Sequence, residues 1–184
     1  AALPGDRPIL VDSAGCGAAL KRYGHLLGSP AAEAFAARVL DVHEWLAPQM
    51  GRLPTGRQTA GSVIVHDPCH LRHAQGCHGA VRDVLQPYME VVELDDEGLC
   101  CGAGGAYSLT EPVLADEVRQ RKVAAIGRAA GRSGATVVVS ANPGCTMHLV
   151  AAGVDVRHPM EVLAEALRED PAEAGIGESV GDAG

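Results

Sequence analysis

The sequence predicts an α/β protein with a parallel sheet, made of Rossmann-like modules in tandem of which the first is incomplete. Three observations predict this class. Short apolar runs rich in β-branched residues alternate with helical segments, cysteines follow the ends of these runs, and part of the pattern occurs twice. A length of 184 residues is enough for one ordinary domain or two small halves packed together.

The first 50 residues are expected to hold one strand and two helices. Residues 7–11 form a compact apolar run bounded by turn residues, which is typical of a buried strand. This strand leads to a turn that carries Cys16, and helical spacing follows over residues 18–27. The alanine-rich stretch 31–45 begins after Ser29-Pro30 and predicts a stronger helix.

Residues 51–61 are expected to form a linker, after which a second strand covers residues 62–66. Asp67 as N-cap and Pro68 at the first helical position predict a helix from Cys69 to about residue 86. This start would place the Cys69 thiol beside free N–H groups at the positive end of the helix dipole. Such a position favours a thiolate.

The remaining elements continue the alternation. Residues 89–94 predict a third strand, and a long amphipathic helix capped by Thr110 is expected over about residues 111–130. Residues 136–140 and 155–157 predict two further strands, and residues 159–167 the last helix. The tail 170–184 consists largely of glycine, alanine and acidic residues, so we expect it to be disordered.

An internal repeat suggests how the chain is divided. Its aligned pairs are Ile9-Leu10 with Val138-Val139, Gly15 with Gly144, Cys16 with Cys145, Leu20 with Leu149, Gly24 with Gly153 and, after a gap, Glu44 with Glu161 and Leu46 with Leu163. Only the second copy is preceded by the Cys69 and Cys100-Cys101 segments. We therefore expect residues 1–50 to be the C-terminal part of a first module whose N-terminal segment is missing, and residues 62–169 to be a complete second module.

Composition excludes several function classes. A formal charge of −8, with one Trp, one Phe and three Tyr, disfavours binding to nucleic acids. No apolar run is long enough to span a bilayer, and the N-terminus lacks the pattern of a signal peptide. Six cysteines without secretory features indicate a reducing compartment. We expect a cytoplasmic protein that contacts the inner face of the membrane only through partner subunits.

Four cysteines from three segments are expected to share one site. Adjacent Cys100 and Cys101 are poorly placed for a disulfide with each other, and the glycines after them let the backbone approach sulfur. Cys69 and Cys145 also follow predicted strands, whose carboxyl ends meet at one edge of a parallel sheet. Their dispersed origin favours an iron–sulfur cluster over zinc, while a dithiol redox site or inert cysteines remain alternatives.

The cysteine segments resemble a known family. In order and spacing, Asp67-Pro68-Cys69-His70, Cys100-Cys101-Gly102 and Asn142-Pro143-Gly144-Cys145 look like the cysteine-rich CCG domain of heterodisulfide reductase subunits and of lactate-utilisation and glycolate oxidase iron–sulfur subunits. The sequence around Cys69 is most similar to the C-terminal part of the iron–sulfur subunits of bacterial glycolate oxidase (glycolate dehydrogenase). The resemblance covers residues 9–167.

The resemblance implies an electron-transfer subunit of an oxidoreductase, without activity or catalytic residues of its own. A partner subunit with FAD would oxidise glycolate or a similar acid, and electrons would pass toward quinone. A ferredoxin-like N-terminal domain is a further implied partner. The implied cofactor is a [4Fe–4S] cluster, with zinc as the alternative; its ligands would be Cys69, Cys100, Cys101 and Cys145, with Cys16 serving the first module.

One departure from the family pattern limits this assignment. Asn142 stands where the family commonly has a cysteine, as Ser13 does in the partial repeat. This departure disfavours a five-cysteine noncubane cluster and the direct disulfide chemistry of a heterodisulfide-reductase-like subunit. A zinc-binding or cluster-free assembly module is the alternative function.

Other motifs are expected to have ordinary roles. Cys77 should be a small buried residue, and Trp45 should serve packing. His66, His70 and His73 surround Cys69; hydrogen-bonding or surface roles are favoured for them, with roles as metal ligands or as donors to the ligands as the alternative. No role is assigned to His148 or His158. The glycines after Cys101 lack the strand–GxGxxG–helix context, so nucleotide binding is not expected.

Overall fold

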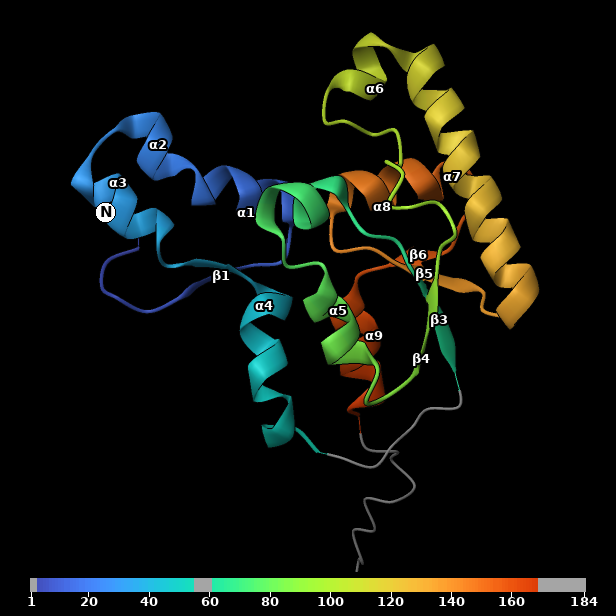
Figure 1. Cartoon of the computed structure of the whole chain (residues 1–184), viewed down its shortest axis with the longest axis horizontal. Helices are drawn as coiled ribbons and strands as arrows, with labels where there is room; N and C mark the ends of the chain where they lie inside the picture. The colour runs from blue at the N-terminus through green and yellow to red at the C-terminus, as the bar shows by residue number, and fades with distance from the viewer. Residues whose placement is uncertain (1–2, 55–60, 169–184) are drawn as a thin grey trace, which may run out of the picture.

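The computed structural model describes residues 3–54 and 61–168 and arranges them as parallel strands flanked by helices (Figure 1). The strands are β1 (Ile9–Val11), β2 (Val39–Asp41), β3 (Ser62–Val65), β4 (Glu90–Glu93), β5 (Val137–Val139) and β6 (Val156–Arg157). The helices are α1 (Ala14–Lys21), α2 (Tyr23–Leu27), α3 (Pro30–Ala36), α4 (Val42–Leu46), η1 (Ala47–Arg52), η2 (His70–Gln75), α5 (Gly79–Leu85), α6 (Tyr107–Thr110), α7 (Pro112–Ser133), α8 (Pro143–Val150) and α9 (Pro159–Ala166). The predicted α/β class with parallel strands is confirmed.

Two expectations concern residues outside these ranges. The tail 170–184 and residues 55–60 of the expected linker lie outside the described residues. Within the described ranges, no helix combines the length and the apolar character needed to cross a bilayer.

The larger sheet reverses its winding direction beside its central strand. Its strand order is β4-β3-β5-β6, and every pairing is parallel. The chain moves outward from β3 to β4, then crosses to the other side of β3 to form β5 and β6. The carboxyl ends of β3 and β5 therefore flank the switch point, where ligands bind in open α/β sheets.

Alternating side chains of this sheet serve two apolar cores. Val63 and Val65 contribute to the core that includes residues of α5 and α9. Ile64 and Val138 contribute to the other core, with residues of α7 and α8. Figure 1 shows α5 and α9 on one side of the strands and α7 on the other. Because the side-chain period of a strand is two, this alternation assigns His66 to the face of Ile64.

The helix predicted over residues 31–45 is wrong in its middle. The structure ends α3 at Ala36, forms β2 and then begins α4. Val39 and Asp41 are buried, and β2 pairs in parallel with β1, so strand pairing overrides the helix propensity of this alanine-rich segment. The sequence did contain a signal for the start of α4. Asp41 and Glu44 form a capping box in which the His43 N–H donates to Asp41 Oδ1 at 2.9 Å.

The helix predicted to run from Cys69 to residue 86 is also wrong. The chain forms the π-helical turn η2, breaks at Gly76 with a φ of 70°, and begins α5 three residues later. Asp67 caps no helix, because its carboxylate accepts hydrogen bonds from Arg82 at 2.6 Å and Arg72 at 3.3 Å. The predicted cap at Thr110 is also wrong, because Thr110 is the last residue of α6 and Glu111 is the residue that precedes α7.

Strand pairing and helix starts recur at the aligned positions of the two repeat copies. In each copy a strand pairs in parallel with a later strand, and a capping box then begins the next helix. The matched features are the pairings Ile9 with Val39 and Val138 with Val156, and the capping boxes Asp41–Glu44 and His158–Glu161. These features agree with the repeat alignment, including its gapped part. The division into an incomplete and a complete module stays a prediction.

Candidate metal centre

Three segments bring four thiols to the carboxyl edge of the larger sheet. Cys69 immediately precedes η2, just beyond β3, and Cys145 lies in the first turn of α8, just beyond β5. Cys100 and Cys101 lie in the loop between β4 and α6. Cys101 and Cys145 are buried, whereas Cys69 and Cys100 are half-buried. The thiols therefore sit at the switch point of the sheet.

These four thiols form one hydrogen-bonded chain. The Cys69 thiol pairs with Cys100, Cys100 pairs with Cys101, and Cys101 pairs with Cys145. The structure thus brings together the four cysteines that the sequence predicts for one site.

Each sulfur of this chain also accepts a hydrogen bond from nitrogen. The donors are Gly102 N–H to Cys100 at 3.3 Å, Asn142 Nδ2 to Cys145 at 3.4 Å, and the backbone N–H groups of His70 and Ala103 to Cys69 and Cys101. N–H donors favour a thiolate over a thiol. They are also one of the means by which proteins adjust metal–sulfur groups.

Crowding keeps most of these thiols protonated in the absence of a cation. Burial raises the pKa of Cys69, and the hydrogen bond to Cys101 raises that of Cys100. Cys101 accepts from Cys100, which lowers its pKa, but donation to Cys145 and burial together raise that pKa to about 12. The pKa of Cys145 is lowered, first by the hydrogen bond from Cys101. A metal cation would replace these protons, so the donor set fits a thiolate-bound metal group.

His66 lies in the same pocket. Its ring is 1% exposed, and neither Nδ1 nor Nε2 has a hydrogen-bond partner among the described residues. Single donor atoms of His66, Cys101 and Cys145 all lie within 4.8 Å of one another. The hydrogen-bonding or surface role expected for His66 is therefore wrong. The two-residue period of β3, which places residue 66 on the same face as Ile64, was the signal for the side of the sheet that its ring takes.

Acidification should destabilise the metal-free protein through His66. Burial, reinforced by the nearby Lys122 cation and opposed by Asp67 and Asp96, lowers the pKa of His66 from 6.5 to about 3. Between these values the unfolded state binds a proton that the native state does not, so stability falls as the pH falls from 6.5 toward 3. We expect urea denaturation to show a loss of about 2 kcal/mol in the free energy of unfolding between pH 7 and pH 5.

The matched variant for this measurement is His66→Leu, which keeps a side chain in the pocket and removes the titrating group. It should lose correspondingly less stability over the same pH interval, because every other side chain is the same in both proteins. Equal losses in the two proteins would contradict a buried, neutral His66.

Asn142 takes part in the site without offering a thiol. Its Oδ1 accepts from the Gly15 N–H at 3.0 Å, and its Nδ2 donates to Cys145. The Ala14 N–H also donates to the Ala141 carbonyl at 2.9 Å. These bonds dock the start of α1 against the start of α8. Cys16 lies in the first turn of α1, not in a turn before the helix, and its exposed thiol is outside the hydrogen-bonded chain.

The other predicted residues have identifiable surroundings. His70 is exposed, with Nδ1 3.6 Å from Cys69 Sγ, and His73 is exposed as well. His158 accepts from Met160 N–H at the start of α9, a capping role that the sequence analysis missed. Cys77 packs against the core of α5 and α9, and burial raises its pKa to about 11.

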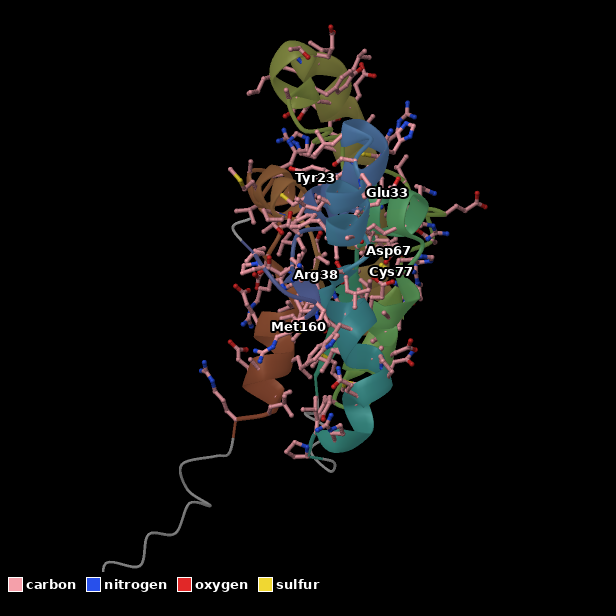
Figure 2. All side chains as sticks on the ribbon, turned by 90° about the vertical axis from the view of Figure 1, so that its left-hand side faces the viewer. Tyr23, Glu33, Arg38, Asp67, Cys77 and Met160 are labelled. Atoms are coloured by element: carbon pink, nitrogen blue, oxygen red, sulfur yellow. The ribbon has the colours of Figure 1, made fainter. Side chains whose placement is uncertain are left out.

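Ion pairs, of which only Arg82–Glu93 has a largely exposed partner among those named here, fasten the strand ends that carry the site. Lys122 of α7 is 1% exposed and contacts Asp96 at 2.5 Å. Arg82 of α5 joins Asp67 at 2.6 Å and Glu93 at 2.7 Å. Figure 2, viewed from the side of the N-terminal helices, labels Asp67. Charges buried in this way need their partners, so these pairs hold the ends of β3 and β4 to the helices on both faces.

A large cleft lies elsewhere. It has a volume of about 900 Å³ and opens to solvent between α8, β6 and α9, where the lining includes Met147, His158 and Glu161. None of the four hydrogen-bonded thiols lines this cleft. We place the site at the thiols because soft donors converge there with an unpartnered, buried imidazole.

Comparison with known proteins agrees with this chemistry. Residues 63–150 match the CCG family, described as a cysteine-rich domain. The chain is 35% identical over 173 residues to the glycolate oxidase iron–sulfur subunit of Escherichia coli (strain K12), covering 90% of this chain and 41% of that protein. It is 32% identical over 154 residues to a subunit of the fumarate reductase (CoM/CoB) of Methanothermobacter marburgensis, covering 80% and 28%.

A third relative is the probable glycolate oxidase iron–sulfur subunit of Bacillus subtilis (strain 168), 28% identical over 149 residues, which cover 77% of this chain and 33% of that protein. The chain thus spans less than half the length of each of these relatives.

Proposed function

Because residues 63–150 belong to the cysteine-rich CCG domain family, we propose that this chain is the iron–sulfur, electron-carrying part of a complex that oxidises a 2-hydroxy acid. The names of the relatives from Escherichia coli and Bacillus subtilis support glycolate as that acid. One observation of the structure carries the proposal. Four thiols from three segments form a single hydrogen-bonded chain at the switch point of the sheet, and every sulfur has an N–H donor.

We propose that Cys69, Cys100, Cys101 and Cys145 hold a [4Fe–4S] cluster, which supplies reversible one-electron transfer when bound. The protein contributes the thiolates, the N–H donors that stabilise negative charge on sulfur, and burial that excludes water from Cys101 and Cys145. Residues 62–169 would form this module, with residues 1–50 and Cys16 belonging to a neighbouring one. The partners would be a subunit with FAD and a ferredoxin-like domain, with electrons passing on toward quinone.

Electron transfer from the hydroxy acid is the test of this function. The chain, loaded with iron and sulfide without oxygen, is mixed with a flavin-dependent glycolate-oxidising subunit, and visible absorption is followed after glycolate is added. We expect glycolate to bleach the absorption only when the flavin subunit is present, and to the extent that dithionite does. If dithionite bleaches the protein but no 2-hydroxy acid does, the substrate assignment is wrong and the iron–sulfur assignment stands.

A zinc-binding assembly module is the second candidate. It is favoured by the short mutual distances of His66, Cys101 and Cys145, three buried donors of the types that zinc prefers. Such a protein would be colourless and would not respond to dithionite.

A further inference from the structure

His66 is a buried potential ligand beside the thiols, and the bonds among the four thiols do not account for it. Each of those sulfurs has hydrogen-bond partners, as described above. The two ring nitrogens of His66 have none among the described residues, although the ring is 1% exposed. A neutral imidazole carries one N–H donor and one lone pair, and leaving both buried without partners is costly. The ring therefore requires a partner that binds nitrogen.

The backbone holds the ring in place. The His66 N–H donates to the Val139 carbonyl at 3.0 Å, which continues the pairing of β3 with β5 beyond the last paired residues of the strands. Since His66 shares the face of Ile64, its ring enters the core that also contains Cys101 and Cys145. Strand pairing thus fixes the backbone of His66 and the direction of its Cα–Cβ bond, as expected for a metal ligand held on a rigid element.

From this geometry we infer that His66 is a direct nitrogen ligand of the metal group held by Cys101 and Cys145. The inference rests on the proposed iron–sulfur function and adds a fifth donor, of a different chemical type, to the four thiols. Because four thiolates supply one ligand to each of the four irons, a fifth donor requires one iron to bind two protein ligands, a thiolate and the His66 nitrogen. The donor atoms of His66, Cys101 and Cys145, within 4.8 Å of one another, are close enough to bind neighbouring atoms of one metal group. Two other imidazoles near the thiols, those of His70 and His73, are exposed. His148 has a buried Nε2 without a partner among the described residues, but it is not part of the group of donor atoms within 4.8 Å of one another.

Nitrogen hyperfine coupling tests the inference independently of activity. The whole chain is loaded with iron and sulfide without oxygen, reduced with dithionite, and studied by pulsed electron paramagnetic resonance, with and without ¹⁵N-labelled histidine. We expect a strong coupling that changes on histidine labelling, as produced by a nitrogen bound to iron. This readout uses the unaltered protein, so it does not depend on whether a variant can be loaded.

Variants assign the coupling to one residue. His66→Cys offers a thiolate at the same position and should retain iron while the histidine coupling disappears. His70→Ala and His148→Ala should retain the histidine coupling. His148 is the useful control because its Nε2 is also buried, without a partner among the described residues, and lies near Gly102.

Bound iron and sulfide without a strong histidine coupling would overturn the inference and leave the proposed function intact. A coupling that survives in His66→Cys would also overturn it. Failure of the chain to take up iron and sulfide would overturn the proposed function together with the inference.

Discussion

Replacing Cys101 by alanine should lower the iron bound after anaerobic loading at least about tenfold, because the change removes a buried thiolate ligand from the centre of the site. Cys101 donates to Cys145 and accepts from Cys100, so its loss also interrupts the hydrogen-bonded chain of thiols. Iron is measured per folded chain after removal of unbound metal.

Cys77→Ala is the matched control. Cys77 is also a free, partly buried cysteine, but it packs against the core of α5 and α9 and takes no part in the thiol chain. Iron content should be unchanged in this variant, with at most a modest loss of stability. If Cys101→Ala retained the iron of the unaltered protein, the four-cysteine site would be wrong.

The second large effect is expected at Gly102, directly after the adjacent cysteines. Its φ of 91° is disfavoured for residues with a Cβ, and an added Cβ would lie 2.4 Å from the Ala115 carbonyl oxygen and 3.1 Å from the Arg119 nitrogen. Both contacts are with the backbone of α7, which cannot move aside cheaply. We expect Gly102→Ala to reduce the free energy of unfolding by about 3 kcal/mol or more and to reduce iron binding, because the loop that carries Cys100 and Cys101 must shift.

Gly105→Ala separates backbone strain from this collision. Gly105 also has a positive φ, of 64°, but an added Cβ would meet nothing within 4 Å. This control should lose only about 1 kcal/mol in urea denaturation and keep its iron. Equal losses in the two variants would show that contact with α7 does not hold the loop.

The convergence of the thiols could be predicted from the sequence because it depends on a general property of parallel sheets. Runs such as 62–66 and 136–140 are short and β-branched, so they are identifiable as strands, and cysteines placed after parallel strands meet at one edge. These inferences use local patterns and one topological rule.

The predictions that the structure shows to be wrong have a different origin. β2 lies in an alanine-rich stretch and exists because it pairs with β1, about 30 residues earlier in the chain. Asp67 looks like a helix cap, yet Arg82 binds its carboxylate from the opposite end of the broken helical segment. In each case a long-range partner outcompetes the local preference, and the sequence does not show that partner.

His66 illustrates the same limit at the site itself. Its neighbours in sequence suggest an ordinary polar residue at the end of a strand. Its burial depends on α7, α8 and the loop of Cys101 closing over the strand end. The period of the strand indicated which face the ring would take, but only the packed structure shows that no protein group among the described residues satisfies its nitrogens.

The central claim is most directly tested by measuring iron, acid-labile sulfide and zinc in one sample of the protein purified without oxygen. The account predicts roughly four iron and four sulfide per chain, as in one cubane cluster, with little zinc. About one zinc per chain without sulfide would contradict it and make the thiols and His66 a structural metal site.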